Sequence, residues 1–137
     1  MKHINRRWNT THEGRLTRFL GMNYNWSASS CTCNTVTYIE RITRRFDVTE
    51  TRLPDSPIDV GFEITETNFE VASTPEQISL YRSLIGSIVC TTTTSRFDVS
   101  YTMFMLSRYL VKPNTRLIDV SKRFIRYLFK TKDLGIT

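Results

Sequence analysis

The chain has 137 residues and a net charge of +6, and 39% of its residues are apolar and 12% aromatic. This length corresponds to one domain or part of one, and the apolar content excludes a wholly disordered protein. No apolar run approaches the roughly 20 residues of a membrane span, and none follows a charged start as in a signal peptide. We therefore expect an intracellular protein, cytoplasmic or nuclear, that is neither secreted nor bound to a membrane.

The first predicted element is a β-hairpin. Apolar residues alternate with small or polar ones in a pattern of period two, which is typical of a half-buried strand. These apolar residues are Leu20, Met22, Tyr24 and Trp26. A serine-rich turn follows, and residues 31–34 are expected to form the return strand. Gly21 within such a strand predicts a bulge or the close approach of another backbone segment.

A helix and a loop are predicted next. Ile39, Ile42 and Phe46 recur at helical spacing, which predicts a helix over residues 35–46. Residues 47–73 contain two prolines, a glycine and most of the acidic residues, a composition that indicates a connecting loop with little regular structure. Such a loop is long for a compact domain.

A helix start signal opens the C-terminal part of the chain. Thr74 is a favourable N-cap, Pro75 stands at the first helical position, and Gln77 completes a capping box. The helix is expected to end within residues 91–94, which are four threonines, because their β-branched side chains and hydroxyl groups compete with helical hydrogen bonding.

Two further helices are predicted after the threonines. Ser95 is the expected N-cap of the first, with Asp98 in its first turn, where the helix dipole favours a carboxylate. The last helix should begin at Asn114 or Thr115. The apolar residues expected to be buried in the three C-terminal helices are Tyr81, Leu84, Ile85, Ile88, Val89, Val99, Met103, Leu106, Leu110, Leu117, Val120, Phe124 and Leu128.

The order of these elements predicts an α+β fold that is mostly helical, with a short N-terminal β-hairpin followed by about four helices. We divide the chain into three segments. Residues 1–34 contain the hairpin, residues 35–73 contain a helix and the acidic loop, and residues 74–137 contain the remaining helices.

Charge is distributed unevenly along the chain. Residues 1–46 carry a net charge of +6, residues 47–94 carry −6, and residues 95–137 carry +6. In one interpretation these are ordinary solvated surfaces whose opposite charges attract each other. In the other, the two ends form a polyanion-binding face and the acidic part is turned away from it. The charge pattern is compatible with both.

The last predicted helix carries a basic stripe. Lys122, Arg126 and Lys130 recur at positions i, i+4 and i+8, beside Arg123. Such a stripe is commonly the solvated face of an amphipathic helix, but with the basic N-terminal segment it also fits contact with a nucleic-acid phosphate backbone. The sequence contains no Gly-rich phosphate loop, no nucleophile elbow and no zinc-protease motif.

Metal binding is the weaker of two interpretations of the cysteines. Cys31 and Cys33 are one residue apart, but with Cys90 the count is odd, and His3 and His12 lack ligand-like spacing. Free thiols in a strand are the favoured alternative. The acidic residues of the loop are likewise expected to be solvated rather than to converge on a two-metal site. We therefore assign no catalytic residue, no metal ligand and no cofactor.

Four longer stretches, which together extend over essentially the whole chain, match one protein family in the same order. They read GRLTRFLGMNYNW, TYIERITRRFDV, YRSLIGSIVCTTTTSRFDV and SKRFIRYLFKTKDLG. These stretches resemble the end of the reverse transcriptase domain in the Pol polyprotein of copia-type retrotransposons. That family typically reads GxLxxFLGMxI, then YIEKLLERFGM, then YRSLIGSLLYL with TRPDI, and closes with a run like RILRYLKGTKDLGL.

The resemblance implies a segment between the polymerase palm and the RNase H domain. It places a primer-grip-like hairpin at Phe19, Leu20, Gly21 and Met22. The later helices would be thumb and connection elements that follow the RNA/DNA template–primer. In them, the residues expected to contact the nucleic-acid backbone are Lys122, Arg123, Arg126 and Lys130. The implied partners are nucleic acid and the rest of the Pol polyprotein.

The family's catalytic Tyr-x-Asp-Asp motif precedes the FLG segment and is absent from this sequence, and the RNase H carboxylates would follow Thr137. We therefore expect the chain alone to be inactive, with Mg²⁺ needed only by the intact polymerase. Phe97 replaces the proline of Thr-Arg-Pro-Asp, and Cys90 and Thr91 replace the usual Tyr-Leu. Two alternatives to a reverse transcriptase fragment are a non-enzymatic nucleic-acid-binding module and an inert retroelement remnant.

Overall fold

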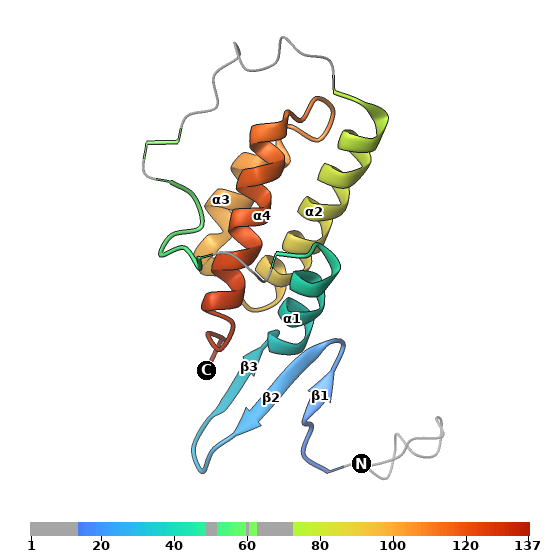
Figure 1. Cartoon of the computed structure of the whole chain (residues 1–137). Coiled ribbons are helices and arrows are strands. Elements are labelled where there is room, and N and C mark those ends of the chain that lie inside the picture. The colour runs from blue at the N-terminus through green and yellow to red at the C-terminus, as the bar shows by residue number, and fades with distance from the viewer. Residues whose placement is uncertain (1–13, 49–51, 60, 63–72) are drawn as a thin grey trace, which may run out of the picture.

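The computed structural model of this chain describes residues 14–48, 52–59, 61–62 and 73–137. A small antiparallel sheet lies at one end of the molecule, beyond the helices (Figure 1). Its strands follow each other in chain order, and they are β1 (Arg18–Phe19), β2 (Met22–Trp26) and β3 (Cys31–Asn34). The predicted hairpin is therefore confirmed, although its central strand begins at Met22 rather than at Leu20.

Gly21 lies in a turn, which corrects the predicted bulge. Phe19 pairs with Met22, so Leu20 and Gly21 form a two-residue connection between β1 and β2. Their φ angles are 50° and 82°, the left-handed conformation that tight hairpin turns require and that glycine adopts without steric cost. Apart from its neighbours in sequence, no described residue has an atom within 4 Å of the position that a Cβ at Gly21 would occupy, so the predicted close backbone approach is also wrong.

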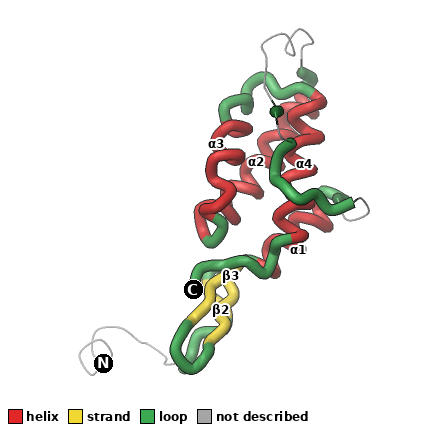
Figure 2. Tube along the Cα trace, turned by 90° about the vertical axis from the view of Figure 1, so that its left-hand side faces the viewer, coloured by secondary structure: helices red, strands yellow, loops and turns green. Residues whose placement is uncertain are grey.

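Four α-helices follow the sheet in the described part of the chain. They are α1 (Val36–Arg45), α2 (Pro75–Thr94), α3 (Ser100–Ser107) and α4 (Thr115–Lys130), with a short 3₁₀ turn, η2 (Phe97–Val99), before α3. The α2 helix packs against α3 and α4, and α1 packs against α4 (Figures 1 and 2). The mostly helical α+β fold is thereby confirmed. None of the described helices is long and apolar enough to cross a membrane.

Two of the three predicted start signals, those of α2 and α4, operate as local caps. The Thr74 hydroxyl accepts a hydrogen bond from the Gln77 amide at 3.3 Å, and the Thr74 amide donates to the Gln77 side chain at 3.0 Å. This capping box satisfies two amide groups that lack helical partners. At α4, the Asn114 side chain accepts from the Leu117 amide at 2.8 Å.

The α2 helix continues to the last of the four threonines. The hydroxyl groups of Thr92 and Thr93 donate to the carbonyl groups of Ile88 and Val89, four residues earlier. Because the hydroxyls of Thr92 and Thr93 are satisfied inside the helix, they do not disrupt it, and α2 ends at Thr94.

Ser95 does not cap the following helix, which corrects another prediction. Its hydroxyl lies 2.9 Å from that of Thr35, and both side chains are buried. Neither η2 nor α3 has a side-chain N-cap. Asp98 is in the first turn of η2, as predicted, and its carboxylate pairs with Arg96.

The core lies between the four helices. Ten of the thirteen residues predicted to be buried in the C-terminal helices are buried, and Val89, Met103 and Leu110 are partly buried at the edge. Ile39 and Ile42 of α1 reach the same core. The amphipathic spacing of the sequence therefore predicted the buried faces correctly.

The end of the chain returns to the sheet. Ile136 and Cys33 exchange two backbone hydrogen bonds of 2.9 and 2.7 Å, and Lys132 forms an ion pair with Glu40 of α1. A Cβ on Gly135 would lie 2.2 Å from the Cys33 carbonyl oxygen, so this close approach requires glycine. The contacts hold the sheet against the helical part of the molecule.

Candidate nucleic-acid interface

The outer face of α4 carries the predicted basic stripe. Its inner face is buried in the core through Leu117, Phe124 and Leu128. The four predicted cations are all at least partly accessible to solvent, and these are Lys122, Arg123, Arg126 and Lys130. One helix thus uses its apolar spacing to build the core and presents its cations on the surface.

An acidic loop segment lies along this basic face. We call residues 52–59 together with Gly61 and Phe62 the strap. Asp59 pairs with Arg123, with Oδ1 and Nη2 2.9 Å apart, and Asp55 forms an ion pair with Lys130. The Arg123 guanidinium also donates to the Ser56 hydroxyl at 3.4 Å.

These contacts correct one part of the second interpretation of the charge pattern. The described part of the acidic segment is not turned away from the basic residues but covers some of them. Opposite charges on the strap and α4 attract each other, and the Lys130 ammonium group holds the pKa of Asp55 below its ordinary value. Glu63, Glu66 and Glu70 lie outside the described residues.

Apolar contacts anchor the strap at both ends and between them. Pro54 is buried, and Ile58 and Phe62 pack against the core. The Phe62 ring also lies beneath the Arg116 guanidinium, 4.8 Å from ring centre to the carbon atom of that group. The strap is therefore held by packing as well as by charge.

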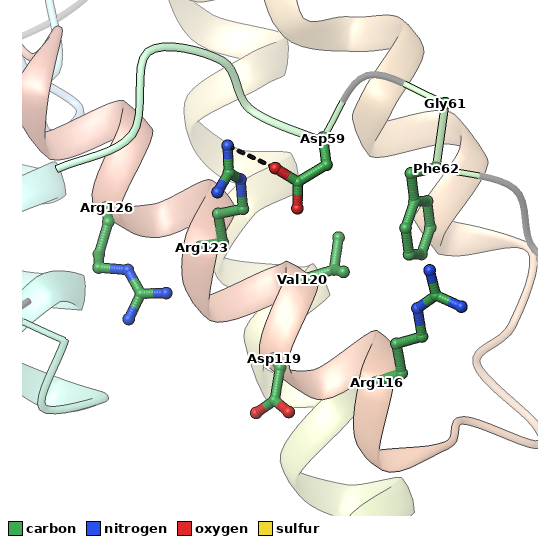
Figure 3. A pocket seen from close by; sticks show the side chains of 8 residues that line it. All are labelled: Asp59, Gly61, Phe62, Arg116, Asp119, Val120, Arg123 and Arg126. Carbon is green, nitrogen blue, oxygen red and sulfur yellow. Dashed lines mark ion pairs between the residues drawn. The ribbon is translucent and has the colours of Figure 1, made fainter. Parts of the chain in front are cut away.

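A shallow cavity of about 380 Å³ remains between the strap and α4. In Figure 3, Arg123 reaches toward Asp59 and Arg116 toward Phe62, with Val120 between them. The lining residues are Asp59, Gly61, Phe62, Arg116, Asp119, Val120, Arg123 and Arg126. Three arginines against two carboxylates leave an excess of positive charge at this place.

The tip of the β1–β2 hairpin is open to solvent. The exposed fraction is 53% for Phe19 and 79% for Leu20, whereas Met22 is half-buried. Two arginines, Arg15 and Arg18, are exposed in the same part of the chain. The four hairpin residues and the four cations of α4 thus form two separate groups on different parts of the molecule (Figure 1).

One surface feature was missed in the sequence. The aromatic face of α3, which we define as Phe97 of the preceding turn η2 together with Tyr101 and Phe104 of α3, has exposed fractions of 59%, 74% and 62%. These residues recur at i, i+4 and i+7, the same spacing that identified the buried face of this helix. The signal was present in the sequence, but a spacing of this kind does not reveal which of two apolar faces is covered.

The described residues contain no group of three or more His, Cys, Asp or Glu side chains that could hold a metal ion. Cys31, Cys33 and Cys90 are free thiols. His3 and His12 lie outside the described residues.

No protein-family model matches this chain, and no solved structure matches it significantly. The chain is similar to a Saccharomyces cerevisiae protein named "Putative transposon Ty5-1 protein", with 26% identity over 122 residues. The matched region covers 88% of this chain but only 39% of that relative. The similarity supports a retrotransposon origin.

Proposed function

We propose that this chain is a segment of a copia-type reverse transcriptase and that it contributes to holding the template–primer by its phosphate backbone. The observation that carries the proposal is the cationic outer face of α4, on a chain with similarity to a transposon protein. Arginine and lysine side chains that contact phosphates hold a duplex without reading its sequence, which is what a polymerase requires.

The motif order YRSLIG, SRFD and RYLFKTKDLG supports the copia-type assignment. In this proposal α2, α3 and α4 are thumb and connection elements, and the exposed hairpin tip is the primer-grip-like element. The residues proposed for the hairpin role are Phe19, Leu20, Gly21 and Met22. Since this sequence contains no Tyr-x-Asp-Asp motif, the segment supplies binding, and the Mg²⁺-dependent chemistry belongs to the complete polymerase.

A non-enzymatic nucleic-acid-binding module is the second candidate. The core that all four helices share favours it, because a segment with its own core can fold independently. A soluble monomer with a cooperative thermal transition would support the module, whereas a loosely packed or aggregated chain would support a fragment of a larger domain.

The proposal can be tested by charge reversal on α4. An RNA/DNA duplex labelled with a fluorophore is titrated with the parent chain and with Lys122→Glu/Arg126→Glu at several salt concentrations. The slope of log K against log salt is negative, and each lost phosphate contact should reduce its magnitude by about 1. The double variant should therefore bind more weakly, with a slope that is shallower by about 2.

Arg41→Glu/Arg44→Glu is the matched control, because it makes the same charge change at two exposed positions of α1. It should weaken binding much less. Equal binding by the parent and the α4 variant at every salt concentration would reject the α4 assignment. A parent chain without any affinity for nucleic acid would instead indicate an inert remnant.

A further inference from the structure

We infer that the strap and a nucleic-acid backbone are alternative occupants of the outer face of α4, so that the chain's own carboxylates compete with phosphates for the same cations. This inference rests on the proposed function, because it concerns the regulation of that binding face.

The strap runs antiparallel to α4, and its contacts with the helix are regularly spaced. Its residues 55, 59 and 62 contact residues 130, 123 and 116 of the helix, respectively. Successive helix positions are therefore seven residues apart, or about 10 Å along the axis. The two carboxylates of the strap thus lie along one stripe of α4, where the phosphates of a bound polyanion strand would also lie.

The two ion pairs are suited to displacement. The exposed fraction of the side chain is 88% for Asp55 and 63% for Asp59, so water screens both carboxylates. A nucleic acid that replaces them gains entropy from the release of its condensed counterions, which a carboxylate on the strap does not provide. Phosphates therefore have an advantage over the resident carboxylates.

The apolar anchors allow the carboxylates to leave without loss of the strap. Pro54 is buried before Asp55, and Phe62 packs against the core after Asp59. Asp55 and Asp59 can turn away from α4 while Pro54, Ile58 and Phe62 keep the strap attached. Binding is thus reduced but not abolished by the strap.

The test uses Asp55→Asn/Asp59→Asn in the full chain, titrated with the same RNA/DNA duplex. Removal of both competing charges should tighten binding about 3- to 30-fold at moderate salt, the range set by two exposed ion pairs. The matched control is Asp47→Asn/Glu76→Gln, which makes the same change in net charge at two exposed positions outside the strap. It should change the affinity less than about 2-fold, because distant exposed charges are screened.

Three outcomes would overturn the inference. Unchanged affinity of the strap variant, with clear binding by the parent, leaves the proposed function intact and removes the competition. Equal gains in the strap variant and the control show an effect of net charge alone. No binding by either chain at any salt concentration rejects both the inference and the proposed function.

Hydrogen exchange supplies a second readout that needs no variant. The Phe62 amide donates to the Asp59 carbonyl oxygen at 3.1 Å, which should slow its exchange in the free chain. If Asp59 turns away from α4, its carbonyl oxygen leaves this hydrogen bond, so addition of duplex should accelerate exchange at the Phe62 amide even though the Phe62 ring stays packed. Unchanged or slower exchange in the saturated complex would show that the strap stays in place.

Discussion

The Arg96 guanidinium and the Asp98 carboxylate form a two-point ion pair, with Nε–Oδ1 at 2.9 Å and Nη2–Oδ2 at 2.8 Å. Arg96 is only 1% exposed, whereas the Asp98 side chain is 47% exposed. The remaining nitrogen, Nη1, donates to the carbonyl oxygen and the hydroxyl of Thr131, at 3.0 and 2.9 Å. One buried side chain therefore joins the turn before α3 to the end of α4.

Asp98→Ala should destabilise the fold. It leaves a buried guanidinium with fewer partners, which costs about 1–3 kcal/mol, less than a fully buried pair because Asp98 is half-exposed. Urea denaturation followed by circular dichroism measures the difference. Asp133→Ala, at an exposed position, removes the same charge and should change the free energy of unfolding by less than about 0.5 kcal/mol. Equal effects of the two variants would contradict a structural role for the pair.

Stability should fall in acid, and Asp98 should account for part of the loss. The Arg96 guanidinium holds the pKa of Asp98 below its ordinary value of 3.8. Because the folded-state pKa is the lower one, the contribution is fully present above the unfolded-state pKa and is lost as the pH falls through the folded-state pKa. Melting temperatures between about pH 6 and pH 2 should decline less steeply for Asp98→Asn than for the parent. Parallel curves would refute this prediction.

Tyr81→Phe should weaken the contact between α2 and α3. The buried Tyr81 hydroxyl donates to the Leu106 carbonyl oxygen at 2.7 Å, and burial raises the pKa of this phenol above its usual range. Loss of the bond should cost about 1 kcal/mol, because that carbonyl still accepts from the Tyr109 amide. Tyr101→Phe is the control, since Tyr101 is 74% exposed, and it should leave the urea midpoint unchanged.

The aromatic face of α3 should promote self-association. Its three aromatic side chains are exposed and recur at near-helical spacing, so we expect them to present an apolar surface that water solvates poorly. Sedimentation velocity should show larger species with rising concentration for the parent and mainly monomer for Tyr101→Ser/Phe104→Ser. Leu20→Ser removes an exposed apolar side chain from the hairpin tip and should not abolish association. A parent chain that stays monomeric at the highest concentration tested would rule out this role.

Features that depend on near neighbours could be predicted from the sequence. The caps at Thr74 and Asn114 each join residues three positions apart, and the buried faces of the helices follow from apolar spacing. The turn at Gly21 was predicted instead as a bulge or a close backbone approach, although it is also a local feature. Its two positive φ angles require a chain reversal that an alternating apolar pattern across the same residues does not reveal.

Contacts between residues far apart in the sequence decided the features that could not be predicted. The sequence by itself determined the helices, the hairpin and the basic stripe, because each depends on the types of residues that are close together in the sequence. Only the tertiary structure decided that the Ser95 hydroxyl meets Thr35 instead of capping a helix, and that Asp55 meets Lys130 across 75 positions of sequence. Such pairings depend on how the helices pack, so the covering of the basic face could not be read from charge alone.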